Sequence, residues 1–461
     1  MIAPLLVVAA LAAPAAHDWT RFGYDAVRSS ASPNATGITA SNAGQLQRQR
    51  VELGGTADSS PIFLHDVDVG GAKRDAFFLT TTYGRTVAVD AASGRVLWRY
   101  TPPGYGSWAG SYRITNATPV VDPNRRFLYA AGPDGRIRKL TVADGRQVWS
   151  RAITLLPQRE KIAASLNFSR GLVIATTGGY VGDAPPYQGH VVTLRPSTGA
   201  IVHVWNSLCS NRHRLIQPSS CGASDSAIWG RAGPVVEPGS GRLLVATGNG
   251  PWNGRTNWGD SALELTPTAS RLLQNWTPRN QDELNRTDAD LGSTSPAFLG
   301  HGLALQGGKD GKLRLLRLAR LNGTPRAGAR TGGEVQTIAA PGGTDVFTAP
   351  AVWHQGGTTW VFVADNAGTA GYRLAQARLR RVWAKSIAGT SPVVVGGLLY
   401  VYDPNGSLRI LRATTGATVA TLPAGSGHWN SPIVVAGRVA LPEGDANDHR
   451  ESGFLNIYRL P

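Results

Sequence analysis

The sequence predicts an all-β protein, an eight-bladed β-propeller built from four-stranded blades. A short phrase of a small residue, a proline and β-branched or apolar residues recurs along the whole chain. Glycine-rich turns separate the strand-like runs between these phrases, and the 461 residues include 56 Gly and 29 Pro, which suits many turns and few helices. A repeat of about 40–60 residues is the sequence signature of propeller-type architectures.

The proline phrase marks seven of the eight units. Its copies are "SSPIF" at Pro61, "ATPVV" at Pro119, "AGPVV" at Pro234, "TSPAF" at Pro296, "TAPAV" at Pro350, "TSPVV" at Pro392 and "NSPIV" at Pro432. The long gap between Pro119 and Pro234 contains "AASLNFSRGLVIATTG", which has the shape of a further unit without its proline. Eight units are therefore expected.

Each unit follows the same order of strands and turns. The proline opens a strand, where its missing N–H costs least. Turns such as "DAASG", "VADG" and "PSTG" supply the positive φ that a tight connection needs. The fourth strand often carries a tryptophan, and we expect these rings to pack between neighbouring blades: Trp98, Trp149, Trp205, Trp276 and Trp383.

The last unit, residues 425–461, is one strand short. The segment "LQRQRVELG" at residues 46–54 could supply the missing strand, so that the N-terminal part of the chain closes the ring. The alternative is two separate β domains. No linker-like segment divides the chain, which favours one closed domain over residues 17–461.

The first residues have the pattern of a secretory signal. "MIAPLLVVAALAAPAA", residues 1–16, has a short apolar core that ends in small residues, although no Lys or Arg precedes it. An N-terminal anchor helix is the alternative. We expect a secreted, periplasmic or envelope-exterior protein. In such a compartment the two cysteines, Cys209 and Cys221, are expected to form one disulfide, with two free thiols as the alternative.

The net charge of +16 comes almost entirely from arginines that are scattered singly. Nucleic-acid grooves show clustered basic residues, so no nucleic-acid partner is expected. The sequence also has no Gly-x-Ser-x-Gly elbow, no phosphate-binding glycine loop and no His-Glu-x-x-His zinc motif.

The turn-plus-tryptophan phrase "VAVDAASGRVLW" and the opening "DWTRFGYDAVRSSASPN" resemble the repeats of pyrroloquinoline quinone (PQQ) propellers. In that superfamily, quinoprotein alcohol dehydrogenases use the fold as an enzyme, and a barrel-assembly lipoprotein of outer membranes uses it as a scaffold. The resemblance covers nearly the whole chain and implies the fold more strongly than the function.

The segment "SAIWGRAGPVVEPGSGRLLVATGNGPWN" resembles the part of quinoprotein dehydrogenases that surrounds the cofactor. The resemblance implies that Trp229 forms the floor under the quinone ring and that Asn249 gives an oxygen ligand to calcium. Gly248 and Gly250 would allow close backbone approach around this loop.

Two further segments follow in the family's order. "NQDELNRTDADLGSTSP" lies where the family has its catalytic aspartate, which implies Asp290 or Asp288 as the base that takes the hydroxyl proton of an alcohol. "QGGKDGKLRLL" resembles the segment whose basic residue contacts the quinone, here Lys309. Calcium would polarise the quinone carbonyl.

The sequence departs from the family pattern at the calcium site. Tyr180, in "TTGGYVGDAPPYQG", occupies the place of a glutamate ligand, and Asp183 could substitute for it. The family's ring of adjacent cysteines is absent. Arg113, in "SYRITNATP", is a further candidate contact to the cofactor, and Asp445 and His449 lie in a polar loop that could face the funnel.

Two functions therefore follow from the sequence. The first is an exported oxidoreductase that oxidises an alcohol or sugar with PQQ and calcium and passes electrons to a separate acceptor. The second is a non-catalytic scaffold that binds a partner protein or envelope polymer. The ordered series Trp229, Asn249, Asp290 and Lys309 favours the first, and Tyr180 favours the second.

Overall fold

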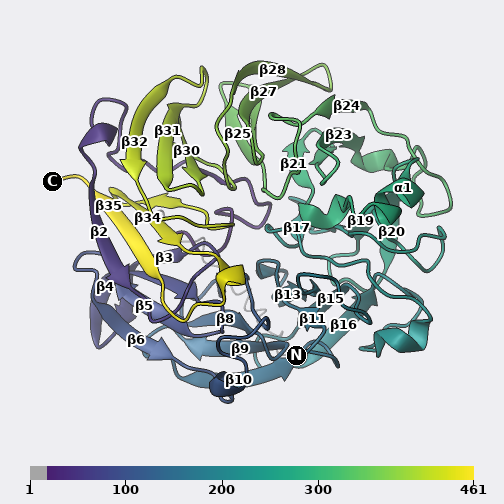
Figure 1. The fold of residues 1–461 in the computed structure, drawn as a ribbon, viewed down its shortest axis with the longest axis horizontal. Coiled ribbons are helices and arrows are strands. Elements are labelled where there is room, and N and C mark those ends of the chain that lie inside the picture. Colours follow the sequence, from purple (N-terminus) through teal and green to yellow (C-terminus); the bar gives the residue numbers. More distant parts are fainter. Residues whose placement is uncertain (1–17) are drawn as a thin grey trace, which may run out of the picture.

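The computed structural model describes residues 18–461. The segment predicted as a signal peptide, residues 1–16, lies outside the described residues, and a domain boundary at residue 17 stays a prediction. Eight blades of four antiparallel strands follow one another around a ring in chain order, from purple to yellow in Figure 1, and one of these sheets gains a short fifth strand. The predicted all-β, eight-bladed propeller is confirmed.

The first four blades cover residues 62–276, and each runs from an inner to an outer strand. Blade 1 is β3 (Ile62–Val69), β4 (Ala72–Thr80), β5 (Thr86–Asp90) and β6 (Val96–Tyr100); blade 2 is β7 (Val120–Val121), β8 (Phe127–Gly132), β9 (Arg136–Thr141) and β10 (Gln147–Ala152). Blade 3 is β12 (Asn167–Ser169), β13 (Leu172–Thr176), β15 (His190–Leu194) and β16 (Ile201–Asn206); blade 4 is β17 (Val235–Val236), β18 (Leu243–Ala246), β19 (Ala262–Leu265) and β20 (Leu272–Trp276).

Blades 5 to 7 repeat this order. Blade 5 is β21 (Ala297–Gly300), β22 (Leu303–Gln306), β23 (Lys312–Arg317) and β24 (Gln336–Ala339); blade 6 is β25 (Ala351–Gln355), β26 (Thr358–Ala364), β27 (Thr369–Ala375) and β28 (Arg378–Lys385). Blade 7 is β29 (Val393–Val395), β30 (Leu398–Asp403), β31 (Ser407–Arg412) and β32 (Thr418–Pro423). The one α-helix among residues 18–461, α1 (Gln281–Arg286), lies between blades 4 and 5.

Blade 8 takes its outer strand from the start of the chain. It consists of β33 (Ile433–Val435), β34 (Arg438–Glu443), β35 (Phe454–Arg459) and β2 (Gln47–Glu52). Strand β2 pairs antiparallel with β35 over six residues, from Gln47 opposite Arg459 to Glu52 opposite Phe454. The predicted closure of the ring by the N-terminal part of the chain is confirmed.

The hydrophobic core lies between the blades, because the sheets stack face to face around the ring. Phe78 of blade 1, for example, shares an apolar cluster with Leu128 of blade 2. Trp98 and Trp149 pack as expected: each indole N–H donates to a carbonyl of the next blade, that of Val142 and that of Pro196, at 3.0 Å in both cases. The recurrent tryptophans therefore join neighbouring blades.

One end of the ring is crossed by a segment that we call the N-terminal strap, residues 19–32. Its carbonyls accept hydrogen bonds from the inner strands of blades 2, 4 and 7, from Val121 of β7 to Thr20, from Val236 of β17 to Ala26 and from Val394 of β29 to Ser30. Its last residues form β1 (Ala31–Ser32), which pairs parallel with β29. The strap thus occupies the end at which the inner strands finish.

Loops at the other end lie before each inner strand and between the second and third strands of a blade. These two kinds of loop meet at the same end because all blades share one topology. No helix in residues 18–461 has the length and apolar character that crossing a bilayer would require.

Candidate functional site

Six of the seven candidate cofactor, metal and catalytic residues line one cavity at the end of the ring opposite the strap. The cavity has a volume of about 270 Å³, close to the lower end of the roughly 300–1,000 Å³ usual for small-molecule sites. The six residues are Asp183, Trp229, Asn249, Asp288, Asp290 and Lys309. They come from blades 3, 4 and 5, so the fold brings together segments that are far apart in the sequence.

Lys309 and Asp290 form the central ion pair of the cavity. Nζ of Lys309 lies 2.6 Å from Oδ2 of Asp290, whose side chain is only 4% exposed. Burial raises the pKa of Asp290 to about 6, although Lys309 and the backbone N–H of Asn249 act in the opposite direction. Asp290 is therefore mainly a carboxylate at neutral pH and close to its titration range.

The predicted loop "TGNGPWN" is held directly against Asp290. The backbone N–H of Asn249 donates to Oδ1 of Asp290 at 2.6 Å. A Cβ on Gly248 would lie 2.1 Å from the same oxygen, so only glycine allows this approach. The side chain of Asn249 makes no hydrogen bond within residues 18–461 and borders the cavity.

Asp288 lies on the open side of the same pair. Its Oδ1 accepts from Nζ of Lys309 at 3.1 Å, and its side chain is 58% exposed. Burial disfavours the charged form of Lys309, but Asp290 and Asp288 outweigh it and raise the pKa of the lysine. Lys309 therefore stays a cation, and the geometry favours Asp290 over Asp288 as the buried acid–base group.

Three aromatic rings form a half-buried floor for the cavity. Trp229 lies 5.6 Å from Trp429 and 6.0 Å from Phe347, measured between ring centroids, and Phe347 and Trp429 are 5.9 Å apart. Nζ of Lys309 lies 5.6 Å from the centre of the Trp229 ring. An aromatic ring face next to a fixed cation suits a planar, anionic or carbonyl-bearing ring.

The residues do not complete a calcium shell. The Tyr180 hydroxyl donates to the carbonyls of Pro133 and Pro157, at 3.3 and 3.0 Å, instead of facing Asn249 as a ligand. Oδ1 of Asp183 accepts from the Tyr187 hydroxyl at 2.9 Å, and both oxygens of Asp290 already have N–H donors. Calcium prefers six to eight oxygen ligands, so this donor set fits a quinone ring better than a metal ion.

Arg113 is not among the residues that line this cavity. Its guanidinium donates to the carbonyl of Pro133 at 3.2 Å and lies 5.8 Å from the ring of Trp108. Arg113 and Tyr180 thus share the Pro133 carbonyl as a hydrogen-bond acceptor. The structure gives Arg113 a role in packing the loop around Tyr180.

Several polar residues of the cavity region escaped the sequence reasoning. Lys161 is 4% exposed and lines the cavity, and burial lowers its pKa to about 8. Asp260 is fully buried and accepts from the Leu291 N–H at 3.1 Å, and burial raises its pKa well above the usual range. Neither residue stands in a repeated motif, so nothing in the sequence marked them.

A second acid–base group joins the first and last blades, and the sequence reasoning had marked only its Asp445, in the polar loop expected to face the funnel. Nδ1 of His428 lies 2.8 Å from Oδ2 of Asp58 and 3.4 Å from Oδ1 of Asp445. These three side chains could hold a metal ion by their mutual distances. However, Asp58 also accepts from Asn116 Nδ2 and from the Trp429 N–H, both at 2.8 Å, so its oxygens are already occupied. The arrangement is that of a histidine oriented by a buried carboxylate.

The predicted disulfide is present between Cys209 and Cys221, with Cα atoms 6.0 Å apart. It closes the loop between β16 and the segment that carries Trp229. The loop includes a short 3₁₀ helix at Pro218–Cys221.

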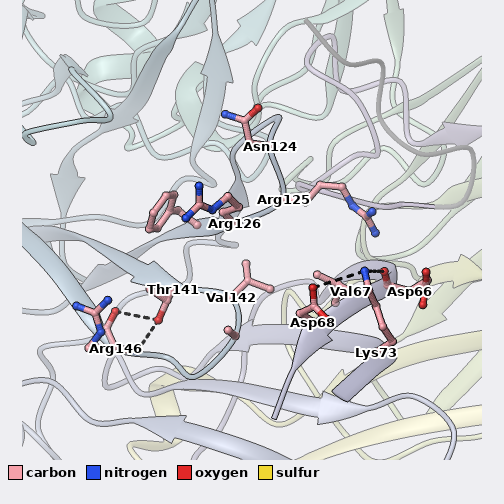
Figure 2. Close-up of a pocket in the computed structure, with 12 residues that line it drawn as sticks. Asp66, Val67, Asp68, Lys73, Asn124, Arg125, Arg126, Thr141, Val142 and Arg146 are labelled. Atoms are coloured by element: carbon pink, nitrogen blue, oxygen red, sulfur yellow. Dashed lines mark hydrogen bonds and ion pairs between the residues drawn. The ribbon is translucent and has the colours of Figure 1, made fainter. Parts of the chain in front are cut away.

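A second cavity, of about 360 Å³, lies between the rims of blades 1 and 2 (Figure 2). Two of its charged groups are paired: Lys73 lies 3.5 Å from Asp68 within the cavity, and Arg125 lies 2.8 Å from Asp18, which is outside it. Arg126 and Arg146 at its edge are solvated surface residues. This cavity shows none of the buried polar groups that distinguish the site at the aromatic floor.

The fold and site together define a propeller whose loops hold a lysine–aspartate pair beside an aromatic floor at one end. A PQQ-repeat family model described as outer membrane protein assembly factor BamB matches residues 32–214. The chain therefore carries PQQ-like propeller repeats, and the resemblance stated from the sequence is confirmed.

Curated relatives include quinoprotein dehydrogenases. The chain is 25% identical over 216 residues to quinohemoprotein alcohol dehydrogenase ADH IIB of Pseudomonas putida, which is 42% of this chain and 29% of that protein. It is 25% identical over 206 residues to the dehydrogenase subunit of the quinone-dependent alcohol dehydrogenase of Acetobacter aceti, 38% of this chain and 26% of that protein. The chain thus spans less than a third of the length of these two relatives.

Solved structures show the same fold at low identity. The quinohemoprotein alcohol dehydrogenase of Comamonas testosteroni superposes with a TM-score of 0.71 at 16% identity, covering 96% of this chain and 80% of that one. BamB from Moraxella catarrhalis superposes with a TM-score of 0.56 at 13% identity, covering 90% and 99%. An enzyme and an assembly factor thus share this architecture.

Proposed function

We propose that this protein is an exported PQQ-dependent oxidoreductase that oxidises an alcohol or sugar at the cavity described above. The observation that carries the proposal is the Lys309–Asp290 ion pair, at 2.6 Å, beside the half-buried ring of Trp229. The relatives named as quinoprotein alcohol dehydrogenases support the reaction class. The substrate, the electron acceptor and export are parts of the proposal.

When bound, the quinone would supply the redox chemistry by accepting two electrons and hydrogen from the substrate. The side chains of this protein would do the rest. Trp229, with Phe347 and Trp429 beside it, would offer an aromatic face to the quinone ring, and Lys309 places a positive charge where negative charge would grow on a carbonyl oxygen. Asp290, with a pKa of about 6, would take the hydroxyl proton of the alcohol.

Calcium remains a prediction from the resemblance, with Asn249 and Asp183 as its proposed ligands. Oδ1 of Asp183 accepts from the Tyr187 hydroxyl, whereas the side chain of Asn249 has no hydrogen bond among the described residues, and no step of the proposal passes through a metal. In its place Lys309 supplies positive charge at the site, held by two carboxylates.

The second candidate function is a scaffold that binds a partner protein or envelope polymer. Tyr180 favours it, because its hydroxyl is committed to two backbone carbonyls where the family has an acidic ligand. The match to the family model described as BamB, an assembly factor, also supports the scaffold.

Activity distinguishes the two candidates. The purified protein is reconstituted with PQQ, with and without calcium, and reduction of an artificial electron acceptor is followed with a panel of primary alcohols and sugars. We expect substrate-dependent reduction that requires PQQ. Absence of turnover with every substrate, in a protein that is folded by circular dichroism, would favour the scaffold.

A further inference from the structure

Lys161 is a buried amine without a partner at the cavity. It lies on the short strand β11 (Glu160–Lys161), which pairs with β14 (Gly178–Gly179) at the edge of blade 3. Within residues 18–461 its Nζ makes no hydrogen bond and no salt bridge, and it lies 5.9 Å from the centre of the Trp429 ring. Buried lysines are normally paired, so this side chain needs another explanation.

The surroundings of Lys161 disfavour the charged form of the amine and so raise the share of neutral amine. Burial is the main cause of its pKa of about 8; Asp58 and Asp445 act to raise the pKa, and Arg231 acts to lower it. Lowering a pKa from 10.5 to about 8 increases the share of free amine at neutral pH about 300-fold. A desolvated lysine of this kind is a nucleophile.

A proton carrier lies beside the same aromatic ring. The His428 ring stacks on Trp429 with centroids 4.2 Å apart and borders the cavity. Its Nδ1 faces Asp58, which is fully buried and stays ionised, because His428 and Arg231 lower its pKa against the effect of burial. Nε2 of His428 has no hydrogen-bond partner among the described residues, so this nitrogen is open to a ligand in the cavity.

We propose that Lys161 condenses with a carbonyl group, an aldehyde or ketone, in this cavity to form an imine. The amine nitrogen attacks the carbonyl carbon and a C–N bond forms, while the π electron pair of the C=O bond moves to the oxygen, which takes up the first of the two amine protons. The nitrogen then loses its second proton to Nε2 of His428, which gives it to the leaving hydroxyl, and water departs as the C=N bond forms. No oxidant or reductant is needed, and the step does not depend on a bound quinone.

Lys309 provides a matched comparison within the same cavity. It lies 2.6 Å from Asp290 and 3.1 Å from Asp288, and these carboxylates raise its pKa. It is therefore a protonated amine and a poor nucleophile at neutral pH. Two lysines that border one cavity are thus expected to differ sharply in reactivity.

The test is reductive trapping of the whole protein at pH 7 with propanal and cyanoborohydride, followed by peptide mass mapping. We expect the propyl adduct at Lys161 at least about tenfold faster than at Lys309 or the half-exposed Lys312. Lys161→Arg should abolish that adduct, and His428→Gln should slow it severalfold. Labelling of Lys161 no faster than Lys312, or none at all, would overturn the proposal. PQQ binding is measured separately, so this result and the proposed function can fail independently.

Discussion

Lys309 and Asp290 are linked twice, through side chains and through backbone. Nζ of Lys309 lies 2.6 Å from Oδ2 of Asp290, and the Lys309 N–H donates to the Asp290 carbonyl at 2.9 Å. The loop that begins blade 5 is thereby tied to the turn between its second and third strands. The ion pair is held in place before any ligand binds, which is the preorganisation that electrostatic catalysis needs.

Asp290→Asn should lower kcat/KM of the dehydrogenase reaction about 10²–10⁴-fold, because the general base is lost and Lys309 loses its closest anion. The wild-type rate should rise with pH through about 6, since only the carboxylate form of Asp290 accepts a proton and burial has raised its pKa to that value. The measurement is kcat/KM against pH from 5 to 8.

Asp288→Asn is the control for that variant. It removes an acceptor of the same lysine, but its side chain is 58% exposed, so a loss of less than about tenfold is expected. The role given to Asp290 would be contradicted if both variants lost the same factor in kcat/KM. It would also be contradicted if kcat/KM of Asp290→Asn still rose with pH through about 6.

Lys161→Met should stabilise the protein at neutral pH. The pKa of Lys161 falls from 10.5 in the unfolded chain to about 8 in the fold, so below pH 8 the folded state carries an unfavourable buried charge. That penalty is at most about 3 kcal/mol and disappears as pH rises from 8 to 10.5, where the folded state binds fewer protons than the unfolded one.

Urea denaturation at pH 7 and at pH 10 measures this effect. The midpoint of Lys161→Met should exceed that of the wild type at pH 7, and the difference should shrink at pH 10. Lys312→Met, at a side chain that is 50% exposed, should show neither change. A destabilised Lys161→Met at pH 7 would mean that the lysine has a stabilising partner.

Gly145→Ala tests the packing of tryptophans between blades. Gly145 has φ +71°, and a Cβ there would lie 2.6 Å from the Trp98 ring, whereas Gly171 has φ +73° and open space around it. Both variants incur about 1 kcal/mol of backbone strain, but only Gly145→Ala should add an overpacking cost of about 1–3 kcal/mol. Equal denaturation midpoints for the two variants would argue against close packing of the Trp98 ring on Gly145.

The Cys209–Cys221 bridge should stabilise the loop before Trp229. A loop of this size is worth about 3 kcal/mol on a chain-entropy estimate, so Cys209→Ser with Cys221→Ser should lower the unfolding free energy by about that amount. Alkylation of the native protein should modify neither cysteine before reduction and both after it. Two titratable thiols in the unreduced protein would show that the bridge does not form.

The repeats made the fold predictable because each blade must bury two faces against its neighbours. The proline phrase, the turn glycines and Trp98 and Trp149 all express that requirement in the sequence. The strand at β2 was predictable for the same reason, since the last unit lacked an outer strand. The path of the N-terminal strap was not, because its backbone hydrogen bonds and its side-chain bonds, such as that from Arg28 to the Leu166 carbonyl, join residues that are far apart in the sequence.

The sequence predicted only those residues of the site that stand in recognisable phrases of blades 4 and 5. Trp229, Asn249, Asp290 and Lys309 stand in phrases that could be compared with a family, and they border one cavity. Lys161 and His428 reach the same cavity from blades 3 and 8, and only the closed ring places them there. Arg113 could not be placed from its loop alone, and the structure directs it to Pro133.

The most direct test of the account is calorimetric titration of PQQ into the purified protein, with and without calcium, compared with Trp229→Ala and Lys309→Met. We expect saturable binding at micromolar affinity or tighter, weakened at least about tenfold in each variant, because one ring supplies the floor and the other side chain the charge. No measurable binding to the wild type under either condition would contradict the central claim that this cavity is a quinone site.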